Sequence, residues 1–184
     1  MKTKIYKIIR IITIPPIIVS ILLITLIINK TITSILDGVL LILFLGIMPI
    51  LSYPINKLFK GNRESERKLS FVFTITSYFL GFLYAIIFVE NKSVKFIYYV
   101  YFLSVVMLTI FNLFITRASG HIASVTGLLF ISFHNISALT LIYTFPIFIL
   151  TYISSIKIKR HNNIELLLGI VTICISYIIT RLIL

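Results

Sequence analysis

Residues 96–115 read FIYYVYFLSVVMLTIFNLFI, an uncharged stretch between Lys95 and Arg117. A helix rises about 1.5 Å per residue, so this stretch can cross a hydrocarbon core of about 30 Å. We identify seven such apolar segments, at 8–28, 34–53, 69–89, 96–115, 121–133, 137–156 and 163–184. The fifth is short, and is either a half-buried helix or continues through 134–135 into the sixth. The pattern predicts an all-α fold, a polytopic membrane helical bundle with six to seven transmembrane helices.

Composition excludes a soluble domain. The chain has 184 residues, 59% of them hydrophobic and 12% charged, whereas globular chains are about 45–50% apolar. We expect a single integral membrane domain over 1–184, with its functional core at about 54–184. The one cysteine, Cys174, lies in an apolar segment, which excludes a disulfide framework and a thiolate metal site. The net charge of +12 comes from cations in loops, so we expect contact with anionic lipid of the bilayer and no nucleic acid.

The first apolar segment follows a basic stretch that ends at Arg10. We interpret this segment as an uncleaved anchor and not a signal peptide, because no small-residue cleavage site follows it. Pro15 and Pro16 should kink its helix.

The loops predict an orientation. If all seven segments span, the N-terminus, 54–68, 116–120 and 157–162 share one face, and the cations of the other face are Lys30, Lys92, Lys95 and Arg181. The first face therefore carries 13 of the 17 Lys and Arg residues. Because cytoplasmic loops are enriched in Lys and Arg, we expect a multi-pass protein of the cell membrane with this face in the cytoplasm.

Three basic, polar islands separate apolar segments on that face. They read KGNRESER (60–67), RASGH (117–121) and SSIKIKRHNNIE (154–165). Charge beside a bilayer is costly, so each island is a functional hypothesis by default. Each also has a structural interpretation as a solvated loop or a helix end. Their occurrence together favours one composite site.

The spacing within the islands supports that interpretation. Six residues separate Lys60 from Arg67, the triplet 119–121 reads Ser-Gly-His, and Ser155 precedes His161 and Glu165. This order resembles the type 2 phosphatidic acid phosphatase superfamily, the lipid phosphate phosphatases, and especially its compact prokaryotic members. Their motifs read Lys-x6-Arg-Pro, Pro-Ser-Gly-His and Ser-Arg-x5-His-x3-Asp. The resemblance covers roughly two-thirds of the chain.

Four positions depart from the family pattern. Lys68 and Ala118 stand where the family has proline, Ser155 replaces arginine, and Glu165 replaces aspartate. The lost arginine matters most, because in the family it holds the phosphate. Candidate substitutes are Arg117, which we favour because it lies close to the start of the 121–133 segment, and Arg63, Lys157 and Arg160.

The resemblance implies a metal-independent lipid phosphate phosphatase without a cofactor. Its substrate would be a polyprenyl or glycerolipid phosphate or diphosphate, hydrolysed through a phosphohistidine. By position, His161 is the nucleophile and His121 the acid and base. Glu165, four residues after His161, shares its helical face and can orient the ring. Expected phosphate-binding residues are Lys60, Arg67, Arg117, Ser119, Gly120, Arg63 and Arg160. Such cations and a helix N-terminus both favour an anion.

Two alternatives stay open. One is a degenerate relative that binds anionic lipid or scaffolds partners without catalysis, as the change at Ser155 suggests. The other is a lipid phosphotransferase that uses an acceptor other than water. A prenyltransferase is disfavoured, because the chain has only five Asp and Glu residues and no paired Asp-rich motif.

Overall fold

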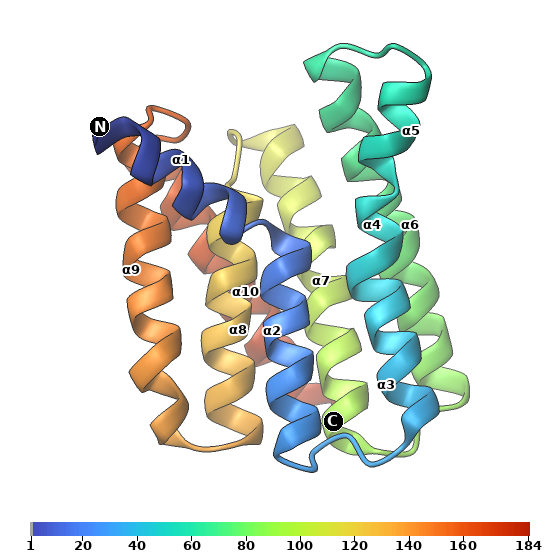
Figure 1. Ribbon diagram of the computed structural model, residues 1–184. Coiled ribbons are helices and arrows are strands. Elements are labelled where there is room, and N and C mark those ends of the chain that lie inside the picture. The colour runs from blue at the N-terminus through green and yellow to red at the C-terminus, as the bar shows by residue number, and fades with distance from the viewer. Residues whose placement is uncertain (1) are drawn as a thin grey trace.

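The computed structural model describes residues 2–184, without the side chains of Lys2, Thr3 and Arg63. Every regular element in this range is helical, and most helices run up and down in one bundle (Figure 1). The predicted all-α helical bundle is therefore confirmed. The elements are α1 (Lys2–Ile12), α2 (Pro15–Ile28), α3 (Ile35–Leu41), the π-helical η1 (Ile42–Ile47), α4 (Met48–Ile50), α5 (Ser52–Leu58), α6 (Arg63–Ile87), α7 (Lys92–Phe114), α8 (Gly120–Asn135), the 3-10 helix η2 (Ala138–Thr140), α9 (Leu141–Lys157) and α10 (Asn163–Ile183).

Five helical stretches are long and apolar enough to cross a membrane. They are Ile35–Leu58, Glu64–Ile87, Lys92–Phe114, Ala138–Lys157 and Asn163–Ile183. A sixth span results if α1 and α2 are counted together, although a bend of 54° separates them. This bend confirms the kink predicted at the two prolines.

The short fifth segment is a helix of its own. α8 has 16 residues and ends at Asn135, before η2 begins. It packs against α2, α7, α9 and α10, so it is the central helix of the bundle. Its buried face carries Ser124, Thr126 and Ser132 between apolar residues. Small and polar residues allow close packing between helices inside a membrane, which suits a central position.

Asparagines and lysines define the helix ends. The side-chain oxygens of Asn62, Asn91 and Asn162 accept backbone N–H bonds at the starts of α6, α7 and α10. Two residues after the ends of α2, α5 and α9 stands a lysine in the left-handed region, namely Lys30, Lys60 and Lys159. The residue after each lysine donates its N–H five residues back, as in a Schellman motif. The turns are thereby fixed by local hydrogen bonds.

All three basic islands lie at one end of the bundle. The 59–62, 115–119 and 158–162 turns are at the upper end of Figure 1, together with the N-terminal helix, and the C-terminus is at the lower end. α1 crosses the upper end at an angle and packs against α9. The predicted gathering of the islands at a single end is therefore seen in the fold.

Candidate functional site

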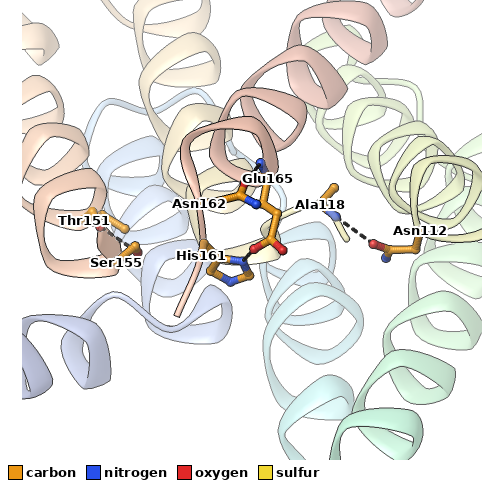
Figure 2. A network of polar contacts seen from close by, with 7 residues as sticks. All are labelled: Asn112, Ala118, Thr151, Ser155, His161, Asn162 and Glu165. Atoms are coloured by element: carbon orange, nitrogen blue, oxygen red, sulfur yellow. Dashed lines mark hydrogen bonds and ion pairs between the residues drawn. The ribbon is translucent and has the colours of Figure 1, made fainter. Parts of the chain in front are cut away.

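The closest polar contact of the third island joins His161 to Glu165. Asn162 caps α10 by accepting the N–H of Glu165 at 2.8 Å, which places Glu165 in the first helical turn. His161 lies before the N-cap and outside α10, so the expectation that it shares a helical face with Glu165 was wrong. Its Nδ1 nevertheless lies 2.6 Å from Oε2 of Glu165. Figure 2 shows the ring and the carboxylate facing each other. Their side chains are 5% and 16% exposed, so the contact is largely shielded from water.

This contact sets the state of the His161 ring. Burial lowers the pKa of His161, Glu165 opposes that shift, and Arg10 and Arg117 add to it. The net direction is downward, so the ring is neutral at neutral pH. An ionised carboxylate only accepts hydrogen bonds, so Nδ1 carries the hydrogen and Nε2 keeps its lone pair. The geometry therefore leaves a nucleophilic nitrogen on a held ring.

His121 stands at the start of the neighbouring helix, α8. Ser119 in the preceding turn donates its N–H to the backbone oxygen of Glu165 at 2.9 Å. Gly169 permits this approach, because a Cβ there would lie 2.5 Å from the Ser119 oxygen. Asn112 on α7 holds the same turn by accepting the N–H of Ala118 at 2.8 Å (Figure 2). The two histidines consequently sit on segments that are bonded to each other.

The surroundings of His121 favour its neutral form. Burial lowers its pKa to about 3, and Arg10 and His161 contribute to the shift. The charge of His161 is thus one of those that act on His121. A neutral His121 cannot donate a proton without help from a bound anion.

The start of α8 also has the features of an anion-binding site. The Oγ of Ser119 is buried and has no hydrogen-bond partner among the described residues. A Cβ built on Gly120 would meet nothing within 4 Å, so space lies beside it. One expectation needs correction: the N–H of Ser119 is not free, because it binds Glu165. The N–H groups of Gly120 and His121 have no acceptor within the helix and remain as donors.

Ser155 and the nearby cations take different positions. Ser155, at the position of the family arginine, is 0% exposed, and its hydroxyl donates to the Thr151 oxygen in its own helix (Figure 2). Arg117 is exposed and close enough to act on His161. Arg160 is exposed and lines an open hollow of about 480 Å³ over the 158–162 turn. The lining residues are Ile156, Lys159, Arg160, His161, Asn162, Asn163 and Glu165.

The first island lies apart from the histidines. Lys60 and Arg67 are exposed at the tip of the α5–α6 hairpin, which Figure 1 shows well away from the 158–162 turn. α6 packs against α7, α5, α4 and η1. Neither Lys60 nor Arg67 is among the charges that shift the pKa of the histidines. The structure thus does not bring these two predicted phosphate ligands to the pair. The side chain of Arg63, a third predicted ligand, lies outside the described residues.

Sequence reasoning missed Arg10. This residue is in α1 and is half-buried, and its Nη1 atom is buried. Its charge acts on both His121 and His161. The sequence showed Arg10 only as one of several cations in a basic N-terminal stretch. The available signal for Arg10 was the predicted bend between α1 and α2, because this bend turns the basic stretch over the bundle.

Among the described residues, no three His, Cys, Asp or Glu side chains are arranged to hold a metal ion. The donor set of the site is therefore two imidazoles, one carboxylate and nearby guanidinium groups.

Comparisons with known proteins add nothing to this geometry. No protein-family model, curated protein or solved structure matches the chain.

Proposed function

We propose that this chain is a membrane phosphatase that removes a phosphate or diphosphate from a polyprenyl or glycerolipid substrate through a phosphohistidine. One observation carries the proposal: His161 is held on Glu165 beside the helix start that bears His121. The helical bundle supports a substrate whose chains stay in the bilayer. The charge bias of the loops favours a cytoplasmic site in the cell membrane.

The first step forms the phosphoenzyme. Nε2 of His161 attacks phosphorus, and the bond between phosphorus and the lipid oxygen breaks. The ring gains positive charge as the new bond forms, and the Glu165 carboxylate, 2.6 Å from Nδ1, stabilises it. The departing oxygen takes a proton from His121, which leaves the lipid as an alcohol or a monophosphate. Such a transfer depends mainly on positioning and charge stabilisation.

His121 must be protonated for that step, although burial favours its neutral form in the empty site. A phosphate monoester carries close to two negative charges at neutral pH. An anion at the start of α8 raises the pKa of His121, so binding recruits the proton that the leaving group needs. In the second step His121 takes a proton from water, the resulting hydroxide attacks phosphorus, and the bond to His161 breaks.

Turnover by purified protein tests the proposal. The wild-type chain in detergent should release inorganic phosphate from a panel of polyprenyl and glycerolipid phosphates and diphosphates. Release should continue in excess chelator, because the reacting groups are side chains. Absence of release from every lipid, or a strict requirement for an added divalent cation, would contradict it.

A second candidate is an anionic-lipid binder without catalysis. Two observations favour it: Ser155 is buried and bonded to its own helix, and Lys60 and Arg67 lie away from the histidines. This candidate predicts binding to vesicles that contain phosphatidic acid, with no phosphate release. The phosphotransferase alternative predicts that release depends on an added lipid or alcohol acceptor.

A further inference from the structure

The N-terminal helix α1 lies over the part of the bundle that holds the two histidines. It crosses the same end as the 158–162 turn and packs against α9 (Figure 1). α9 is the helix that carries Ser155 and leads into His161. A bend of 54° after Ile12 produces this placement. α1 is therefore a neighbour of the candidate site and not a distant anchor.

The cations of α1 differ in their surroundings. Lys4 and Lys7 are exposed, as are Ile8 and Ile11. Arg10 is half-buried, and its Nη1 atom is covered. The helix thus turns one cation toward the bundle and leaves two toward the surroundings.

The buried Nη1 atom places the guanidinium of Arg10 against the bundle. Its charge disfavours protonation of both His121 and His161. Arg117 lowers the pKa of His161 but is not among the charges that shift the pKa of His121. Of these two arginines, Arg10 is the one whose charge acts on both histidines.

We propose that Arg10, delivered by the bent helix α1, is a phosphate-binding residue that takes the place of the cation absent at Ser155. The inference rests on the proposed function for the identity of the substrate, but concerns the phosphate group that a lipid headgroup and free phosphate share. Ser155 is small and fully buried, and α1, which carries Arg10, packs against the helix of Ser155. A guanidinium offers paired donors that match two phosphate oxygens.

Binding of inorganic phosphate tests the inference without requiring turnover. The histidine ring signals of the full chain in detergent are followed by NMR while inorganic phosphate is added. Arg10→Gln should weaken binding about tenfold or more, since bonds to charged groups are strong. Lys7→Gln removes an equal charge from the same helix at an exposed position and should change the dissociation constant by less than about twofold. Arg10→Lys should restore part of the loss, because it keeps the charge but not the fork.

Lipid phosphate turnover separates this inference from the proposed function. Arg10→Gln should raise KM for a hydrolysed lipid phosphate more than it lowers kcat. Equal phosphate binding by wild type and Arg10→Gln, or equal losses in Arg10→Gln and Lys7→Gln, overturns the inference even if the wild type is an active phosphatase. Selective loss in Arg10→Gln with no turnover by the wild type upholds the anion site and rejects the phosphatase. Thermal unfolding shows whether Arg10→Gln is folded. If it is not, Arg10→Lys is used in its place. Phosphate binding by Arg10→Lys equal to that of wild type then overturns the inference, and weaker but measurable binding upholds it.

Discussion

The 158–165 turn and the 59–68 hairpin tip are both short and basic, and in each an asparagine caps the helix that follows. Their surroundings nevertheless differ. In the first, Asn162 starts a helix whose Glu165 holds a shielded histidine. In the second, Asn62 accepts the N–H groups of Glu64 and Ser65 at 2.9 Å. Glu64 pairs with Lys68, and both side chains are more than 70% exposed. The 158–165 turn is packed against other helices, whereas the 59–68 tip is held by contacts among its own residues.

The difference shows that a basic island forms a candidate site only where other segments of the fold pack against it. The backbone of Glu165 is bonded to the turn before α8, and Gly169 lets the two segments touch. The tip is stabilised by the buried Asn56, whose amide lies near the oxygens of Gly61 and Asn62. Its contacts lie within ten residues of the chain. The 158–165 turn is thus the part where a substitution should alter chemistry.

The largest contrast is expected between His161→Ala and Lys60→Ala. Loss of the nucleophile should lower phosphate release by several orders of magnitude. Loss of the exposed Lys60 at the tip should change it by less than about fivefold. Initial rates on a lipid phosphate, with both variants shown to be folded, measure this.

A loss of 100-fold or more in Lys60→Ala would break the comparison. It would mean that the tip reaches the histidines when substrate is bound, as the family resemblance implies. Near wild-type activity of His161→Ala would reject the nucleophile.

Two glycines give the next contrast. In Gly169→Ala the new methyl group would press on the Ser119 backbone, so α8 and α10 must separate and the histidines must shift. A misplacement of this kind can cost about 100-fold in rate. In Gly61→Ala the methyl group would overlap the Asn56 side chain and should destabilise the fold by about 1–3 kcal/mol with kcat unchanged. Activity and thermal unfolding of both variants distinguish these effects.

The acid–base properties of the histidines provide a smaller but sharper test. Burial lowers the pKa of His121 to about 3, so this ring should stay neutral as the pH falls through 6 and 5. Saturating inorganic phosphate should raise that pKa. The pH dependence of the His121 ring signal in NMR, with and without phosphate, measures both values.

The same shift has a consequence for stability. An unfolded His121 takes up a proton near pH 6.5, whereas the folded one does so near 3. The unfolded state therefore binds more protons in this window, and the contribution of His121 to stability is lost as the pH falls through it. His121→Asn should flatten this dependence. An unshifted His121 would contradict the packing at the start of α8.

The smallest effects should be equal in the two regions. Lys159 and Lys60 both adopt the left-handed conformation after a helix, with φ of 54° and 49°. Glycine adopts it without strain, so Lys159→Gly and Lys60→Gly should each change stability favourably by up to about 1 kcal/mol. Unfolding in denaturant measures both. A large loss in Lys159→Gly alone would show that this side chain has a role beyond its backbone.

The sequence predicted the features that depend on local periodicity. The apolar segments and the kink at Pro15 follow from composition and spacing along the chain. The contact between His161 and Glu165 was also predicted, but His161 makes it from the turn before α10 and not from the helix. Features that depend on packing between distant segments were not predictable. The bend of α1 turns Arg10 toward the end of the bundle, where its charge acts on both histidines. The N–H of Ser119 is bonded to the backbone oxygen of Glu165, 46 positions away. The ring of His134 on α8 lies 4.6 Å from that of Phe96 on α7, a contact that spacing along the chain does not indicate.

Direct detection of the phosphorylated residue tests the central claim. Wild type and His121→Ala are mixed with a lipid phosphate, quenched in base, where phosphohistidine survives, and mapped by mass spectrometry. We expect a phosphoryl group on the peptide that contains His161 in the wild type, and none in His161→Ala. In His121→Ala the group should form and hydrolyse more slowly, because the acid of the first step and the base of the second are both missing. A phosphoryl group on another residue, or rapid hydrolysis by His161→Ala, would contradict it.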